Sequence, residues 1–283
     1  MAEEQVQQVK FIDAHVHGFP DKLFDAIWSH FIKNYWNIHI RMYSDEIVRF
    51  IENQGGLYLT LLNYAHKPGI SRDLNDWSYK FGKSRENVLS FGTIHPDDPY
   101  LDEELERVLS PDGLDLKGLK LQILVTDFDP TTKRLDSMYE SLIKHGKILV
   151  MHVGTGPIAN EHVGIDKLRP VLDSYPELNL QIPHLGCFEY DDFLPLALDY
   201  PSIYFDTAMV LIDHDLFPVK GAEQDPGIDQ LLEIQDHVMF GSDFPNIPYD
   251  FSIGIESILQ LPVDEPVKEK ILFKNALSFY NIE

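Results

Sequence analysis

Short apolar runs of β type alternate with amphipathic helical segments along the sequence, and this alternation constrains the fold more than any other feature. Strands separated by helices return in parallel. The most economical closure of so many strands is a (β/α)8 TIM barrel; an open doubly wound sheet is the alternative, but no glycine-rich phosphate loop follows the first run. We therefore predict an α/β TIM barrel that forms a single domain over residues 1–283, built on eight runs: 9–17, 56–64, 87–95, 116–124, 147–154, 178–186, 202–207 and 237–244.

Several connecting segments carry recognisable helix ends. Ser44 begins a predicted helix that Gly55 ends. Asp98 and Pro99 predict the N-cap and the first residue of another helix. A third predicted helix, with an apolar stripe over 135–142, should end at the glycine of position 146.

Two segments are longer than simple connections need. Residues 19–43 follow the first strand and carry Phe24, Trp28, Phe31 and Tyr35 at near-helical spacing. They predict a helical insertion packed on the barrel; a lid or pocket wall, or a subunit interface in a homodimer, is the alternative. Residues 211–229, rich in proline and glycine, predict a long mobile loop after the seventh strand.

Composition excludes several classes of partner. The chain has 46 acidic and 23 basic residues, a formal net charge of −23, which repels nucleic acid and anionic membranes. Cys187 is the single cysteine, so no intrachain disulfide can form. The first residues do not resemble a signal peptide, and no apolar run approaches the ~20 residues that span a bilayer. We expect a cytoplasmic protein that acts on a small molecule and binds neither nucleic acid nor membrane.

Polar, metal-capable side chains end several of the predicted strands. His15 and His17 end the first strand, His152 the fifth, His184 the sixth and Asp243 the eighth. The carboxyl ends of the strands form one face of a barrel, and alternation places His15 and His17 on the same side of their strand. Imidazole and carboxylate groups suit Zn²⁺ or a similar ion with three or four ligands. Their coincidence predicts a metal site.

Each of these signals is weak alone. A single histidine is often a hydrogen-bonded structural residue, and Asp243 could instead cap a following helix. His66 and His95 follow the second and third strands and are candidates for the pocket. The loop residue His162 remains ambiguous, and we interpret the remaining histidines as bystanders: His30, His39, His145, His214 and His237.

Four motifs, in this order, resemble the amidohydrolase superfamily, specifically its amidohydrolase-2 branch: IDAHVH, VMHVGTG, IPHLGC and MFGSDFP. The tail KEKILFKNALSFYNI resembles the closing helices of that branch, so the similarity spans essentially the whole chain. The resemblance implies a distorted TIM barrel that holds one or two divalent metals. It implies that His15, His17 and His152 are metal ligands and that Asp243 is a ligand or the base for a bound water. His184 would bind a second metal, or donate a proton and stabilise an oxyanion.

Binuclear relatives use a carbamylated lysine or a glutamate at the end of the fourth strand. Lys120 lies in the matching stretch, GLKLQ. We expect one divalent metal, Zn²⁺, with Lys120 as a structural or substrate-facing charge. A second metal held by His184 and carbamylated Lys120 is the alternative.

The resemblance implies hydrolysis of a small-molecule amide, ester or lactone by a metal-activated water. Asp243 would take the proton and His184 would hydrogen-bond the oxyanion. The alternative is non-oxidative decarboxylation of an aromatic or unsaturated carboxylate, in which the metal gathers the substrate oxygens. That reaction needs a cation to hold the carboxylate, for which Arg41, Arg72 and Lys120 are candidates, and several such enzymes have Glu-x-His where this chain has His15-x-His17. A barrel that binds metal or ligand without turnover is a third, less favoured class.

Overall fold

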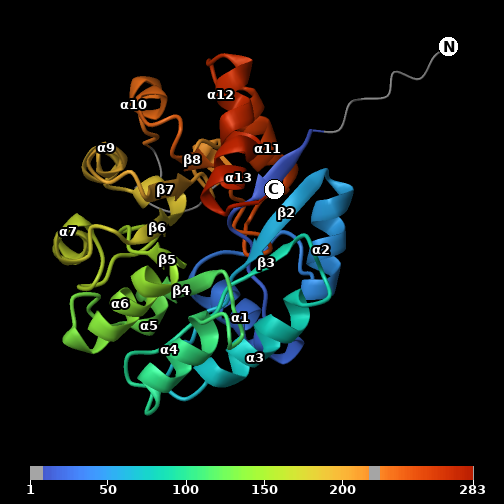
Figure 1. Cartoon of the computed structure of the whole chain (residues 1–283). Helices are drawn as coiled ribbons and strands as arrows, with labels where there is room; N and C mark the ends of the chain where they lie inside the picture. The colour runs from blue at the N-terminus through green and yellow to red at the C-terminus, as the bar shows by residue number, and fades with distance from the viewer. Residues whose placement is uncertain (1–8, 217–223, 283) are drawn as a thin grey trace.

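A computed structural model describes residues 9–216 and 224–282. Within these ranges the strands alternate with helices that lie around them, and the colours run round the ring from blue to red (Figure 1). Every strand pair is parallel. All eight predicted strands are present, each shorter than its apolar run: β1 Phe11–Asp13, β2 Gly56–Leu61, β3 Val88–Ser90, β4 Gly118–Gln122, β5 Ile148–His152, β6 Asn179–Ile182, β7 Ile203–Asp206 and β8 Val238–Met239.

The strand ladders form a sheet β1-β2-β3 and a sheet β4-β5-β6-β7-β8, and backbone hydrogen bonds cross both gaps between them. Between β3 and β4, the Gly92 N–H donates to the Gly118 carbonyl at 2.9 Å. Between β8 and β1, the Ala14 N–H donates to the Phe240 carbonyl at 2.9 Å. The chain is therefore a TIM barrel, as predicted, and not an open doubly wound sheet.

The helices follow the predicted pattern with one exception. The insertion after β1 contains α1 (Asp21–Asn34), and Gly146, with a left-handed φ of 62°, ends α6 as expected. Asp98 is not an N-cap, because α4 begins at Leu101. The described helices are α1, α2 (Ser44–Asn53), α3 (Ser71–Gly82), α4 (Leu101–Leu109), α5 (Ile123–Thr126), α6 (Asp136–His145), α7 (Ile165–Ser174), α8 (Tyr190–Phe193), α9 (Leu196–Asp199), α10 (Ile228–Glu233), α11 (Ser252–Leu259), α12 (Glu265–Glu269) and α13 (Asn275–Phe279).

Asp98 instead connects two loops through hydrogen bonds to its carboxylate. Its carboxylate accepts hydrogen bonds from the Gly69 N–H at 2.6 Å, from the His95 N–H at 2.9 Å and from the Ser71 hydroxyl at 2.5 Å. It therefore joins the loops after β2 and β3. Of the predicted loop 211–229, residues 217–223 lie outside the described part of the chain. None of the described helices is both long and apolar enough to cross a bilayer.

Side chains at alternate positions along a strand pack into two different hydrophobic clusters. In β5, Leu149 and Met151 belong to the large cluster that also contains the buried faces of the surrounding helices, whereas Ile148 and Val150 belong to a second cluster. The second cluster includes Ile12 and Met239 from β1 and β8 and Tyr280 from the end of the chain. The C-terminal segment therefore packs against the strand side chains of the second cluster. In a barrel of this kind the chemistry is carried by the residues at the carboxyl ends of the strands.

Gly118, at the junction of the two sheets, has no room for a side chain. A Cβ there would overlap the Ile148 carbonyl of the neighbouring strand. We expect Gly118→Ala to lower the free energy of unfolding by about 1–3 kcal/mol, as overpacking of a core does. Gly254→Ala is the matched control: its Cβ would lie 3.5 Å from Phe240, an ordinary contact, within α11, so stability should be unchanged or raised by about 0.5–1 kcal/mol. Urea unfolding of the three proteins measures this, and equal stability of Gly118→Ala and wild type would contradict it.

Candidate metal centre and active site

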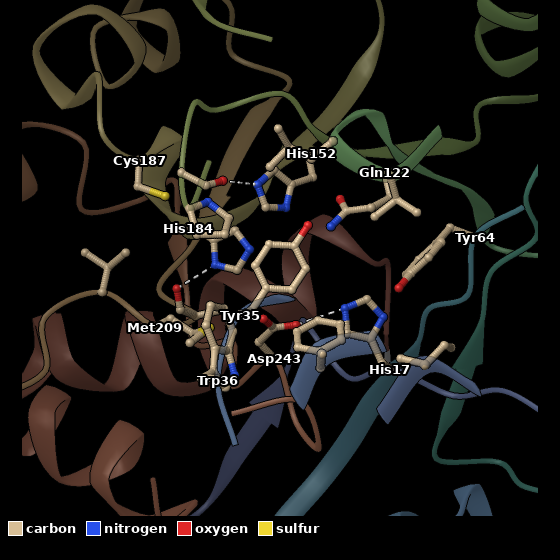
Figure 2. Close-up of a pocket in the computed structure, with 18 of the residues that line it drawn as sticks. His17, Tyr35, Trp36, Tyr64, Gln122, His152, His184, Cys187, Met209 and Asp243 are labelled. Carbon is tan, nitrogen blue, oxygen red and sulfur yellow. Dashed lines mark hydrogen bonds and ion pairs between the residues drawn. The ribbon is translucent and has the colours of Figure 1, made fainter. Parts of the chain in front are cut away.

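The structure brings His17, His152, His184 and Asp243 together in one pocket (Figure 2), and the His15 ring lies beside it, 5.2 Å from the ring of His17 and 5.0 Å from that of His184. His15, His17, His152, His184 and Asp243 are all buried. The backbone turns sharply where two of them leave their strands: His184 has φ 58° and Asp243 has φ 63°. Non-glycine residues in this left-handed region are strained by about 1–3 kcal/mol, and such strain concentrates at functional sites. Asp243 does not cap a following helix, since the next one begins at Ser252.

Hydrogen bonds fix which nitrogen of three histidine rings carries the proton. The Nδ1 atom of His15 lies 3.2 Å from Asp206 Oδ1, that of His17 3.3 Å from the Leu62 carbonyl oxygen, and that of His184 2.8 Å from the Ala208 carbonyl oxygen. A carbonyl or ionised carboxylate oxygen can only accept, so each Nδ1 is the donor. When such a ring is neutral, its Nε2 carries a lone pair that can bind a cation. The Nε2 of His17 faces Asp243 Oδ1 at 2.9 Å, so one cation can bind both atoms.

His152 has the opposite tautomer. Its Nε2 donates to the Gly156 carbonyl oxygen at 2.9 Å, and its Nδ1 is buried without a hydrogen-bond partner in the described structure. The ring lies 4.6 Å from the ring of His184, centroid to centroid. The four strand-end histidines thus use one nitrogen to fix the ring and can offer the other to a metal, which is the arrangement of metal-binding histidines.

Two groups of these atoms are close enough to share an ion. His15, His17 and Asp243 form one group, and His15, His184 and Asp206 form the other; within each, the ligand atoms lie within 4.8 Å of one another. Asp243 Oδ1 is 2.9 Å from His17 Nε2 and 3.5 Å from His15 Nε2. His152 is adjacent but belongs to neither group. The His15 Nε2 atom is buried and unpartnered, so a divalent cation fits the first group and would satisfy it.

The charges of the site also favour a cation. Burial alone would raise the pKa of Asp206 and of Asp243, but the adjacent His15 ring, together with hydrogen bonds, lowers both. Burial raises the pKa of Asp13 to about 7 and lowers that of Lys120 to about 8. Two ionised carboxylates and Asp13 are therefore buried with Lys120, which leaves an excess of negative charge.

Asp206 is the site residue that the sequence reasoning missed. It ends β7, and its carboxylate is fully buried beside the His15 ring. The available signal was its position: an acidic residue ends the apolar run 202–207, just as histidines end the other strands. Its contact with His15 could not be read from the sequence, because 191 residues separate the two.

The pocket has a volume of about 430 Å³. His66 lines it, as expected, whereas His95 does not; the His95 ring packs 5.9 Å from that of Phe128. Lys120 is completely buried outside the lining, and its Nζ has no hydrogen-bond partner in the ranges described. His30 and His214, interpreted from the sequence as bystanders, both line the pocket.

Helix α1 both packs on the barrel and forms part of the pocket wall, the two roles considered for the insertion after the first strand. Phe24 and Trp28 are buried and stack on each other with ring centroids 5.1 Å apart. Leu23, Ile27 and Phe31, on another face of the same helix, line the pocket. The insertion is therefore packed on the barrel and also forms a wall of the site.

None of the three candidate cations for a substrate carboxylate reaches the pocket. Arg72 is paired with Glu103 at 2.8 Å and Glu104 at 2.9 Å, and the Arg41 guanidinium lies 6.0 Å from the Trp28 ring centroid. No lysine or arginine lines the pocket among residues 9–216 and 224–282. An anionic substrate must be held here by other groups.

Fold and site together define a TIM barrel with a candidate histidine–aspartate metal centre at the carboxyl ends of its strands. The sequence model of the family described as amidohydrolase matches residues 60–282, and the chain belongs to this family. Comparison with curated proteins finds no match.

Solved structures share the fold over nearly the whole chain. An uncharacterised TIM-barrel protein from Bordetella bronchiseptica is 16% identical, with 96% of this chain and 99% of that chain covered and a TM-score of 0.71. The 2,6-dihydroxybenzoate decarboxylase from Rhizobium is 17% identical, with 96% and 99% covered and a TM-score of 0.68. The 5-carboxyvanillate decarboxylase from Novosphingobium aromaticivorans, complexed with manganese and 4-hydroxy-3-methoxy-5-nitrobenzoic acid, is 13% identical, with 98% and 97% covered and a TM-score of 0.67. At these identities the similarity shows the fold.

The buried histidines should make the metal-free protein sensitive to acid. Burial lowers the pKa of His15 to about 4 and that of His152 well below its usual range, so both take up protons mainly on unfolding, between about pH 6.5 and 4. Asp13, with its raised pKa, acts in the opposite direction in the same window. The unfolded state therefore binds at least about one more proton, and stability should fall by about 1.4 kcal/mol per pH unit on acidification.

Urea unfolding in the presence of a chelator, from pH 6.5 to 4.5, measures this dependence. His39→Gln is a suitable control because the His39 side chain is 45% exposed; it should leave the slope unchanged. Stability that is constant or rises as the pH falls would contradict the expectation.

Proposed function

We propose that this protein is a metal-dependent enzyme that removes carbon dioxide, without oxidation, from an aromatic or otherwise unsaturated carboxylate. The observation that carries the proposal is that the histidine–aspartate centre opens into a pocket with aromatic walls, formed by Phe31, Tyr35, Trp36, Tyr64 and Phe188. Such walls suit a planar ring. The decarboxylases among the structural neighbours support this reaction over hydrolysis, the first expectation from the sequence.

In this proposal His15, His17 and Asp243 hold one divalent ion, and His152 completes the set from the adjacent strand. Asp206 fixes the His15 ring from behind through the hydrogen bond to Nδ1. Imidazole and carboxylate donors suit several divalent ions, Zn²⁺ and Mn²⁺ among them, and manganese is bound in the Novosphingobium decarboxylase. When bound, the ion supplies the positive charge that attracts and polarises the substrate oxygens.

Neutral donors would complete the recognition of the carboxylate. The Tyr64 ring lies 5.7 Å from that of His17, and burial, helped by the charge of Asp243, raises the pKa of its hydroxyl, which therefore stays a donor. Gln122, which pairs with His152 across β4 and β5, also lines the pocket, and its side-chain amide carries N–H donors. These side chains can bind oxygens of the substrate without a lysine or an arginine.

The reaction breaks the bond between the carboxylate and the ring carbon. The electron pair of that bond stays on the ring carbon, which takes up one proton, and carbon dioxide leaves. His184 faces the pocket with Nε2 and can carry the proton there, while its Nδ1 is held by Ala208. Asp243 keeps its negative charge beside His17 and His15.

Hydrolysis of an amide, ester or lactone is the second candidate. It is favoured by the His15-x-His17 pair, where several aromatic-acid decarboxylases have Glu-x-His. The ionised Asp243, with its lowered pKa, would then accept the proton of an attacking water, and His184 would donate a hydrogen bond to the oxyanion.

A paired screen separates these reactions. Release of carbon dioxide from dihydroxybenzoates and carboxyvanillates is measured beside hydrolysis of aryl esters, lactones and anilides, on the metal-loaded protein. We expect release of carbon dioxide, and Asp243→Asn should lower its rate by about 10–100-fold because a negatively charged ligand of the ion is lost. The exposed substitution Asp250→Asn should leave the rate unchanged. Hydrolysis without release of carbon dioxide would support the second candidate and overturn the first.

Metal binding can be tested without activity. Elemental analysis should find close to one divalent ion per chain. Asp206→Asn should weaken binding by roughly 10–100-fold, because the hydrogen-bonded carboxylate behind His15 is lost, and Asp250→Asn is again the control. A competition titration with a chromophoric chelator gives the dissociation constants. No metal after metal-replete expression, or unchanged affinity of Asp206→Asn, would contradict the assignment.

A further inference from the structure

The pocket is larger than a single-ring acid requires. A benzoate-sized molecule occupies roughly 160 Å³ at the packing density of organic crystals. The cavity of about 430 Å³ leaves more than half of its space beyond such a molecule. Cavities of this size enclose ligands larger than one ring.

The side chains around that space are unevenly distributed. The hydrogen-bonding groups converge from the ends of the strands: Figure 2 shows His17, Gln122, His152, His184 and Asp243 directed into the same pocket. Apolar lining residues come from α1, from the segment after β4 and from the segment after β7, among them Leu23, Ala26, Ile27, Leu124, Val125 and Ile212. The segments after β2, β5 and β6 contribute to the lining as well.

Helix α1 and the segments after β4 and β7 follow different strands, and their apolar side chains, here called the apolar wall, line the same cavity. In the described lining no lysine or arginine is present, and the acidic residues are Asp243 and Asp225, the latter 3.5 Å from His214. A second anionic group on the substrate would therefore lose its hydration without gaining a partner of opposite charge. An uncharged apolar group would instead gain by burial.

We infer that the natural substrate is a carboxylate whose ring or unsaturated head carries an extended, uncharged apolar arm bound between α1 and the segments after β4 and β7. The inference rests on the proposed function for the head group, since the carboxylate must lie at the histidine–aspartate centre. The arm sets specificity through Ile27 and its neighbours and takes no part in the chemistry.

Calorimetry with a series of 4-alkylbenzoates, from methyl to hexyl, tests the arm on the metal-loaded protein. Each methylene that enters the apolar wall should tighten binding by roughly fourfold, which corresponds to about 0.8 kcal/mol per buried methylene. The same chains ending in a carboxylate should lose this gain, because no lysine or arginine of the described lining can pair with it. Carbon dioxide release from dihydroxybenzoates with and without an alkyl chain is measured in parallel.

Ile27→Asn tests the position of the arm, because Ile27 lines the pocket from α1. It should reduce the gain per methylene, with the affinity of the same variant for unsubstituted benzoate as the reference. Ile32→Asn is the matched control on the same helix: Ile32 is 39% exposed and outside the lining, so the gain should persist.

The outcomes separate this inference from the proposed reaction. Affinity that is independent of chain length, or a gain that survives Ile27→Asn, overturns the apolar arm even if short dihydroxybenzoates are decarboxylated. A chain-length gain that Ile27→Asn removes, without release of carbon dioxide from any acid, supports the arm and overturns the decarboxylase.

Discussion

The buried carboxylate of Asp206 is the interaction on which the rest of the site depends. It lies between the His15 Nδ1 at 3.2 Å, the His184 backbone N–H at 3.1 Å and the Gln181 side-chain amide at 2.8 Å. These groups come from the segment after β1, from the segment after β6 and from β6 itself. One charge thus fixes the tautomer of His15 and the strained turn that carries His184. A neutral or shorter side chain would leave several buried donors without a partner.

The same network connects the site with the end of the chain. Tyr280 donates its hydroxyl to Gln181 Oε1 at 2.6 Å, and Gln181 Nε2 donates to Asp206 and to the Ala14 carbonyl oxygen, both at 2.8 Å. Tyr280 is itself completely buried in the second core cluster. The C-terminal segment therefore supports the orientation of a histidine at the opposite end of the sequence, and packing and chemistry share the same contacts.

The fold was predictable because it depends on the local periodicity of apolar residues. Site residues were predictable only where they follow an apolar run that forms a strand. The alternation of apolar runs located all eight strands, and His15, His17, His184 and Asp243 were found from their places at strand ends. Local rules were wrong for Asp98, because its carboxylate is occupied by the nearby His95 N–H and by two donors distant in sequence, the Gly69 N–H and the Ser71 hydroxyl. The size of the pocket was beyond prediction as well, since it depends on how α1 packs over the barrel.

The negative charge of the chain bears on how a substrate carboxylate can be attracted to the pocket. With a net charge of −23 and two ionised carboxylates beside the pocket, the protein should repel an organic acid. No lysine or arginine of the described lining offsets that repulsion, and Lys120 is buried outside it. In the proposed function the divalent charge at His15, His17 and Asp243 must therefore supply most of the attraction for the carboxylate. Binding of the acid and binding of the metal are then thermodynamically coupled, because each ligand raises the affinity for the other by the same factor.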